Sequence, residues 1–170
     1  MGGAAGTGAT ELSNAASAIS QGLELEMAVY PLDGLSVTAG LGYVDATYSK
    51  FEGVALPRGG RIDASGNRIP LSPEITFNTA IQYEGDLVNN YTWLARLDYS
   101  YESERYAAEG VANEPEYLLS SYSLLNARLG IQSPDQSWGF YFWGKNLTDV
   151  QDSEEVRYSR FAAPRLMERY

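Results

Sequence analysis

The chain has 170 residues, carries a formal net charge of −10 and contains neither cysteine nor histidine. The absence of these two residue types excludes disulfide frameworks, thiol nucleophiles, Cys/His metal sites and every mechanism that needs an imidazole base. The acidic charge argues against a nucleic-acid partner, because such a partner binds a basic face. Tyrosine is in excess, 13 residues against 5 phenylalanines and 3 tryptophans, which suits surfaces that are half apolar and half wet.

The N-terminal segment "MGGAAGTGATELSNAAS" has neither a basic region nor an apolar core, so it is not a secretory signal peptide. We expect residues 1–14 to form a disordered leader. No apolar run approaches the ~20 residues that a membrane-spanning helix requires, which excludes a helical membrane protein.

Beyond this segment, apolar and polar residues alternate with a period of two, which is the pattern of β-strands. The alternating runs lie, in chain order, within about residues 17–30, 35–49, 74–84, 91–102, 119–131 and 138–149. They predict an all-β fold, an antiparallel meander of about six long strands. The connections alternate between short links ("PLDG", "GDLVNN", "QSPDQS") and longer segments near residues 50–73, 106–118 and 150–164.

Strand length and aromatic residues favour a membrane barrel. The predicted strands of about 11 to 15 residues exceed the ~5–6 of soluble sheets and are long enough to cross a bilayer when tilted. Aromatic residues near both strand ends, with aliphatic residues between them, are typical of the two girdles of an outer-membrane barrel. Those beside the short links are Tyr30, Tyr83, Tyr91, Trp93 and Trp138. Those toward the long segments are Tyr43, Tyr48, Phe51, Tyr99, Tyr101, Tyr106 and Tyr122. A soluble β-sandwich has the same alternation with its apolar face inward, so periodicity alone leaves both folds open.

Three segments carry a more specific pattern. "NAASAISQGLELEMAVYPLDGLSVTAGLGYVDATYSKF" joins an alternating hydrophobic-acidic run, a P-x-x-G-L turn and a glycine-rich strand that closes in D-A-x-Y. "GNRIPLSPEITFNTAIQY" ends a loop with a hydrophobic-Pro-x-x-Pro step. "YSLLNARLGIQSPDQSWGFYFWGKNLTDV" joins an Asn-x-Arg strand to an aromatic strand that ends in K-N-L-T-D. Together these segments, over about residues 14–150, resemble the late barrel strands of TonB-dependent outer-membrane receptors.

The resemblance implies that residues 15–170 are a C-terminal segment of a transmembrane β-barrel in the outer membrane of a Gram-negative bacterium. It implies uptake of a scarce, bulky nutrient such as a ferric siderophore, and hence iron transport. The partners would be the lipid bilayer of the outer membrane, the rest of the barrel and its plug domain, the TonB complex through that plug, and a siderophore-like ligand. No nucleic acid is implied.

The chain also departs from the family. Family barrels have about 22 strands around a plug, whereas this chain has about six strands and no plug. The ending "FAAPRLMERY" keeps an aromatic last residue, Tyr170, but only five residues follow the Pro-Arg pair and Glu168 breaks the alternation. The last strand therefore looks shortened. Because open sheet edges are costly in lipid, we interpret the chain as a fragment, a split component or a remnant with another fold.

Two groups of residues are candidates for binding. Three arginines of the loop "RGGRIDASGNR" could attract an anionic ligand or could lie in a solvated loop: Arg58, Arg61 and Arg68. In the same loop "DASGN" is a turn, because it lacks the distal glutamate of a calcium loop. Charged or aromatic residues predicted to face the lumen could line a substrate path or form an ion-pair network: Glu24, Glu26, Arg96, Asp98, Arg128, Trp143 and Lys145.

The alternation also predicts sidedness. We expect lipid to contact Leu25, Leu41, Leu97, Leu129 and Phe142. We expect the lumen to be lined by Glu26, Gly42, Arg96, Arg128 and Trp143.

The sequence has no nucleophile elbow, phosphate-binding glycine loop or metal-ligand cluster, so we expect no enzyme, cofactor or metal. The alternative is a small soluble or self-associating β-sandwich or barrel, a binding protein derived from such a fragment.

Overall fold

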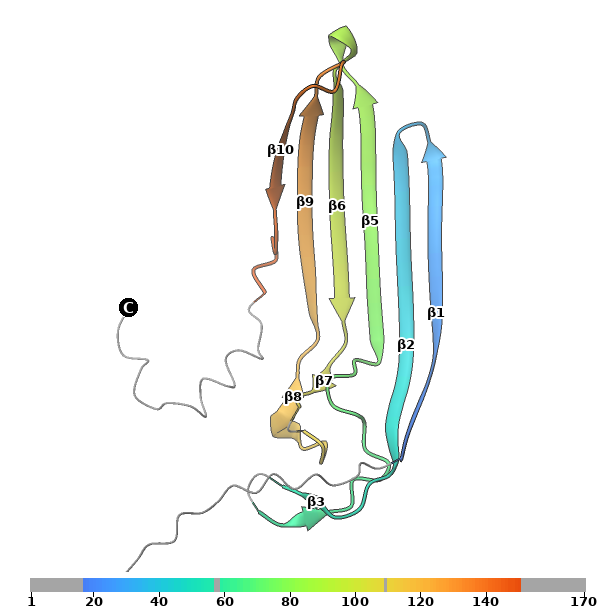
Figure 1. Ribbon diagram of the computed structural model, residues 1–170, viewed down its shortest axis with the longest axis vertical. Coiled ribbons are helices and arrows are strands. Elements are labelled where there is room, and N and C mark those ends of the chain that lie inside the picture. The colour runs from blue at the N-terminus through green and yellow to red at the C-terminus, as the bar shows by residue number, and fades with distance from the viewer. Residues whose placement is uncertain (1–16, 57–58, 109, 151–170) are drawn as a thin grey trace, which may run out of the picture.

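Six strands, five of them long, form a single antiparallel sheet (Figure 1). The computed structural model describes residues 17–56, 59–108 and 110–150. The strands are β1 (Ser17–Leu32), β2 (Leu35–Lys50), β5 (Ile75–Asp86), β6 (Thr92–Glu102), β9 (Tyr122–Gln132) and β10 (Gly139–Gly144). The sheet order β1-β2-β5-β6-β9-β10 follows the chain, and each strand pairs with the next in antiparallel register. This arrangement confirms the predicted all-β meander of six strands.

The first hairpin turns more tightly than predicted. β1 runs on through Pro31 to Leu32, so the turn contains only Asp33 and Gly34. Proline lacks a backbone donor and is tolerated in an edge strand, and the pairing of β1 with β2 shifts by one residue at this point. Gly34 adopts a φ of 79°, which glycine accepts without strain.

The last strand of the described sheet is shorter than predicted. β10 has six residues, because the Lys-Asn-Leu-Thr-Asp segment after it folds back onto β9. Asn146 and Asp149 have positive φ angles of 52°, which a strand does not accommodate. The amide of Asn146 donates to Asn126 Oδ1 at 2.9 Å, and the amide of Leu147 donates to the carbonyl of Leu125 at 2.8 Å. The polar end of the aromatic strand is therefore a turn fixed to its neighbour.

The long connections contain short elements that the sequence did not reveal. The first carries a hairpin of β3 (Val54–Ala55) and β4 (Arg61–Ile62). The second carries β7 (Arg105–Tyr106), the 3-10 helix η2 (Pro115–Tyr117) and β8 (Leu118–Leu119). A further 3-10 helix, η1 (Val88–Asn90), lies in the short link between β5 and β6. None of the helices among the described residues is long and apolar enough to cross a membrane.

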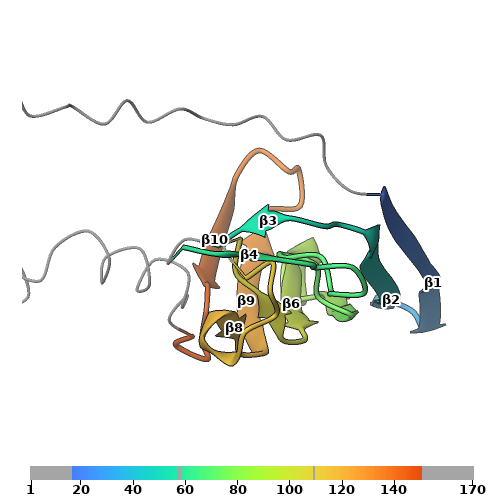
Figure 2. The ribbon, with the colours of Figure 1, turned by 90° about the horizontal axis from the view of Figure 1, so that it is seen from below.

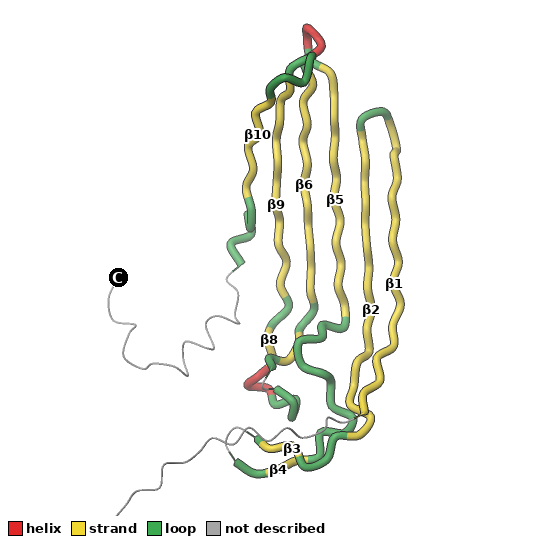
Figure 3. Tube along the Cα trace, viewed as in Figure 1, coloured by secondary structure: helices red, strands yellow, loops and turns green. Residues whose placement is uncertain are grey.

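Short and long connections lie at opposite ends of the sheet (Figures 1 and 3). The two long connections extend past the strand ends on one side, where the β3–β4 hairpin and the β7–β8 region occupy the same end of the molecule (Figures 1 and 3), and Figure 2 looks onto this end from below. We call this side the long-loop end and the opposite side the short-turn end. The alternation of connection lengths predicted from the sequence is thus a real asymmetry of the sheet.

The register assigns each strand residue to one of two faces, because directly paired residues on neighbouring strands point the same way. On one face, Leu25 pairs with Leu41, and Leu41 pairs with Phe77. On this apolar face lie all five residues predicted to contact lipid: Leu25, Leu41, Leu97, Leu129 and Phe142. On the opposite, polar face lie all five predicted to face the lumen: Glu26, Gly42, Arg96, Arg128 and Trp143.

The apolar face is uncovered within the described part of the chain. Leu25 is 63% exposed and Phe142 is 75% exposed. The buried hydrophobic side chains among the described residues are Ala64, Ala80, Tyr117 and Leu119, and three of these four lie in the long connections. A β-sandwich would bury its apolar face against a second sheet. The described sheet is instead a single layer whose apolar face requires an apolar environment.

Ring contacts among the described aromatic residues lie toward both ends of the sheet, and three of the five lie at the short-turn end. Tyr83 lies 5.3 Å from Trp93 between ring centroids, and Trp138 lies 5.7 Å from Tyr91 and 5.4 Å from Phe140. The girdle at the long-loop end is less complete than predicted. Tyr48 pairs with Ala18, and Tyr122 pairs with Glu102. Tyr48 lies six residues from Gly42 on β2, and Tyr122 lies six residues from Arg128 on β9. Both tyrosines therefore lie on the polar face, because residues an even number of positions apart on one strand share a face.

The turn between β9 and β10 is organised by one carboxylate. Ser133 Oγ and Ser137 Oγ each donate to Asp135 Oδ1 at 2.7 Å, and the Ser137 amide donates to the same oxygen at 3.2 Å. The hydroxyl of Ser133, then the hydroxyl and amide of Ser137, lower the pKa of Asp135 to about 2. Ser133 is 4% exposed, so its hydroxyl depends on these partners.

Acidification should loosen this turn. The folded-state pKa of Asp135 lies below the ordinary value near 3.9, so folding favours the charged carboxylate. Its stabilising contribution is fully present above about pH 4 and is lost as the pH falls from about 4 to 2. We expect the Ser137 amide resonance, measured by NMR in detergent micelles, to shift with a midpoint near pH 2. Asp135→Asn should abolish the shift and Asp33→Asn, in the other turn, should preserve it. If the Ser137 amide resonance of the unaltered chain shifted with a midpoint near pH 4, the lowered pKa of Asp135 would be contradicted.

Candidate functional site

The polar face brings together five of the seven residues predicted to face the lumen. They line one open depression of about 590 Å³ over β6, β9 and β10: Arg96, Asp98, Arg128, Trp143 and Lys145. The remaining two, Glu24 and Glu26, share this face of the sheet but lie on β1, opposite Gly42 and Gly40. Because β2 and β5 lie between β1 and β6, the strand of the depression nearest to β1, these two carboxylates do not join the depression.

Arg96 is the centre of a polar network on β6. Its Nε lies 3.0 Å from both carboxylate oxygens of Asp98, and its Nη2 lies 2.6 Å from Asp98 Oδ1. Its Nη1 donates to Gln82 Oε1 at 3.1 Å, and Gln82 Nε2 donates to Glu84 Oε1 at 2.8 Å. Two residues apart on one strand, Arg96 and Asp98 point to the same face, so the alternation itself positions this ion pair.

Arg128 occupies the position directly opposite Arg96. Like charges in directly paired positions repel, and Asp98 relieves this repulsion by neutralising Arg96. The guanidinium of Arg128 lies 4.3 Å from the centre of the Tyr141 ring, which is a cation–π geometry. Tyr141 in turn packs over Gly130, where a Cβ atom would overlap the ring. The glycine in "LGIQS" is the sequence signal for this packing, although it does not identify the aromatic partner.

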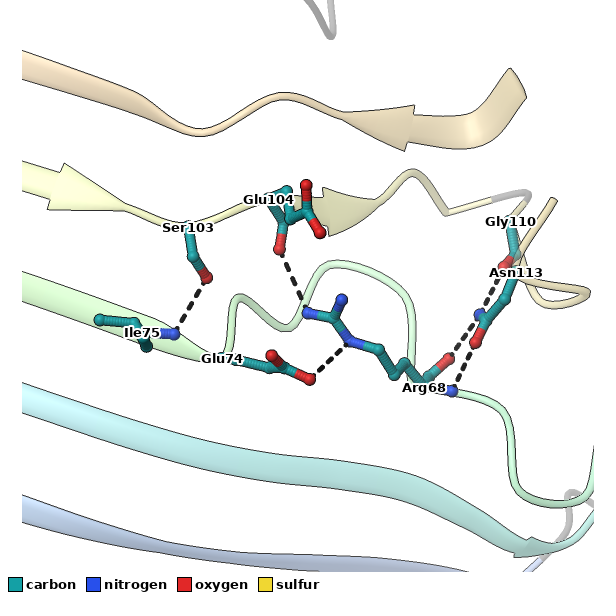
Figure 4. Close-up of polar contacts among 7 residues, drawn as sticks. All are labelled: Arg68, Glu74, Ile75, Ser103, Glu104, Gly110 and Asn113. Carbon is teal, nitrogen blue, oxygen red and sulfur yellow. Dashed lines mark hydrogen bonds and ion pairs between the residues drawn. The ribbon is translucent and has the colours of Figure 1, made fainter. Parts of the chain in front are cut away.

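The second candidate region is the junction of the two long connections at the long-loop end (Figure 4). Arg68 Nε lies 3.1 Å from Glu74 Oε1, and Arg68 Nη2 donates to the carbonyl of Glu104 at 3.2 Å. The backbone of Arg68 donates to Asn113 Oδ1 at 2.7 Å and accepts from Asn113 Nδ2 at 3.0 Å. Asn113 Nδ2 also donates to the carbonyl of Gly110 at 3.2 Å. Arg68 therefore connects the first loop to its own last residue before β5 and to the second loop.

The other two loop arginines lie apart from this junction or outside the described residues. Arg61, at the start of β4, donates from Nη1 to the carbonyl of Gly53 at 3.2 Å. Arg58 is outside the described residues. Ligand binding by the three arginines stays a prediction. The described residues contain no group of three or more Asp, Glu, His or Cys side chains that could hold a metal ion.

The "DASGN" segment forms the predicted turn. The amide and hydroxyl of Ser65 donate to Asp63 Oδ1 at 2.9 and 2.5 Å. The hydroxyl of Ser65, followed by its amide, lowers the pKa of Asp63 below its ordinary value. Ser65 Oγ also accepts from the amide of Phe51 at 2.9 Å, which closes the base of the first loop.

Two asparagines of the loop junction were missed by sequence reasoning. Asn113 pairs with Arg68 across 45 positions in the chain, and Asn67 Nδ2 donates to the carbonyl of Val111 at 2.9 Å. Asn113 has a φ of 55°, a conformation in which asparagine is favoured. No local pattern reports a contact of this sequence separation.

Removing the Asn113 side chain should separate the two loops. Asn113→Gly tolerates the positive φ, so it tests the hydrogen bonds rather than backbone strain. We expect local opening to become easier by about 1–3 kcal/mol, the cost of leaving backbone groups unpaired. Hydrogen exchange at the Arg68 amide should accelerate accordingly. The matched control is Asn89→Gly, since Asn89 has a φ of 61° and lies in the short link at the other end. If hydrogen exchange at the Arg68 amide were equally fast in both variants, the two hydrogen bonds between Asn113 and Arg68 would not hold the loops together.

Comparison with known families agrees with the geometry. The family model described as TonB dependent receptor-like, beta-barrel, matches residues 2–147. No solved structure matches the chain. The match covers most of the chain, including all six strands of the sheet. Members of this family are transporters of the Gram-negative outer membrane and are not enzymes. The chain therefore belongs to the TonB-dependent receptor β-barrel family.

Proposed function

We propose that residues 15–170 form a C-terminal part of the wall of a receptor barrel, preceded by a leader at 1–14, and that the receptor takes up a scarce, bulky nutrient such as a ferric siderophore. The observation that carries this proposal is the sorting of the two faces by the register. One face exposes leucines and aromatic rings, and the other carries arginines and carboxylates. A barrel wall between lipid and a wet lumen requires this division.

The energetics support lipid contact for the apolar face. Burying apolar side chains stabilises a protein by roughly 25 cal/mol for each Å² removed from water. The exposed side chains that would gain this energy include Leu23, Leu25, Leu97, Leu129, Phe140 and Phe142. In water the same apolar surface would promote aggregation of the protein, because it extends across six strands.

The outer strands of the sheet explain the need for the rest of the barrel. β1 and β10 each have one neighbour in the described sheet, so one side of each strand presents backbone groups without a strand partner. In hydrocarbon such groups cost several kcal/mol each, and closure of the barrel removes them. The remaining partners are the plug domain inside the lumen, the TonB complex that acts on the plug, and the ligand.

In this proposal the long-loop end receives the ligand. The arginines Arg58, Arg61 and Arg68 attract an anionic ligand to the first loop, while the residues of the polar face line its path. The junction around Arg68 and Asn113 supports the loops as one unit. No residue of the chain performs catalysis.

Cysteine labelling tests the sidedness. The chain has no cysteine, so each single substitution introduces a unique thiol. The test compares two pairs of adjacent residues, each with one residue on the apolar face and one on the polar face. The pairs are Leu25→Cys with Glu26→Cys on β1, and Leu129→Cys with Arg128→Cys on β9. In the complete receptor in outer membranes, we expect a charged, water-soluble thiol reagent to modify the Glu26 and Arg128 variants. The two leucine variants should react only with a lipid-soluble maleimide. Modification of the leucine variants by the charged reagent would exclude lipid contact.

Uptake measurements test the transport role. Cells that produce the complete receptor should accumulate a radiolabelled ferric siderophore, because the TonB complex supplies the energy for release from the plug. Cells without TonB, and cells without the receptor, are the controls. Accumulation of cobalamin or an oligosaccharide in place of the siderophore would keep the transport role and reject the ligand class. Accumulation that is independent of TonB would reject the transport role.

A further inference from the structure

The depression on the polar face has an uneven distribution of charge. Arg96 is neutralised by Asp98, with contacts of 2.6 to 3.0 Å. Arg128 and Lys145 line the same depression, and neither has a carboxylate partner among the described residues. In a chain with a net charge of −10, this region therefore holds two positive charges that have no carboxylate partner within the described part of the chain.

The Arg128 guanidinium and the backbone at Lys145 are each fixed by neighbouring groups. The Arg128 guanidinium lies over the Tyr141 ring, and that ring rests on Gly130. Lys145 lies between the end of β10 and the turn that is fixed to β9 through the hydrogen bond from the Asn146 amide to Asn126 Oδ1. A guanidinium that is already positioned, as that of Arg128 is, loses little entropy when an anion binds.

An aromatic surface lies beside the two cations. Trp143 is the direct cross-strand partner of Arg128, lines the depression and is 69% exposed. Tyr141 is engaged by Arg128 and Gly130, so Trp143 offers the free ring. An exposed indole next to two cations matches a ligand that combines a planar apolar group with a negative charge.

We propose that this depression is a subsite for the carboxylate of an aromatic nutrient, with Arg128 and Lys145 on the carboxylate and Trp143 against the ring. The inference rests on the proposed transport function, because it places the subsite on the lumenal wall along the ligand path. It adds the chemical class of the group that the wall recognises. In this proposal Arg128 and Lys145 bind the transported ligand, and no carboxylate of the receptor neutralises them.

The test uses the complete receptor in detergent micelles and the probe 2-naphthoate, followed by isothermal titration calorimetry. A charge-assisted hydrogen bond is worth about 1.5–3 kcal/mol, so Arg128→Gln should weaken naphthoate binding by about ten- to a hundredfold. Lys145→Gln should weaken it in the same direction. Trp143→Leu should remove the preference for naphthoate over acetate, because the ring contact is lost.

Two controls make the outcome decisive. The neutral analogue 2-naphthalenemethanol should bind equally to the unaltered receptor and to Arg128→Gln. Lys50→Gln, at an exposed ion pair with Glu52 at the far end of β2, should leave naphthoate binding unchanged.

Two outcomes would overturn the subsite. In the first, the receptor itself supplies a carboxylate to Arg128. Naphthoate then does not bind, and Arg128→Gln lowers the melting temperature of the ligand-free receptor. Undiminished binding to Arg128→Gln overturns it too. Siderophore uptake that persists in either case would show that the transport function stands without this subsite.

Discussion

The pairing of each strand with its neighbour in a fixed register is the constraint on which the structure depends. A strand places alternate side chains on opposite faces, so one pairing decides the face of every residue in both strands. A shift by one residue would move Leu25 to the polar face and Glu26 to the apolar face. The sheet avoids this slip because both faces have a strong preference, one for an apolar medium and one for water.

The same constraint organises the charges. Arg96 and Asp98 are two residues apart and so form their ion pair on one face of β6. Cross-strand pairing then places Arg128 opposite Arg96, and Trp143 opposite Arg128. The depression over these strands is thus a product of register rather than of a folded loop. This origin gives it the rigidity of the sheet.

The period-two pattern was sufficient to predict the strands, their order and their faces, because each of these depends on local alternation and on chain neighbours. The six-residue length of β10 was not predictable, since its end is set by a turn that bonds to Asn126 on the preceding strand. The position of Tyr122 on the polar face was also missed, because aromatic residues near strand ends suggest a girdle whichever way they point. At the long-loop end, Arg68 was predicted either to attract a ligand or to lie in a solvated loop, and its contacts with Glu74, Glu104 and Asn113 were not predictable. Its bonds to Asn113 span a sequence distance that no local rule reaches.

The junction between Arg68 and Asn113 has a consequence for how receptors of this kind can diversify. Surface loops are usually exchanged or lengthened independently, since each closes on its own two strands. Here the second loop supplies the asparagine that satisfies both backbone groups of a residue in the first. A new first loop grafted from a relative would leave that asparagine without its partner, so new ligand specificity is inherited most readily when both loops are transferred as a pair.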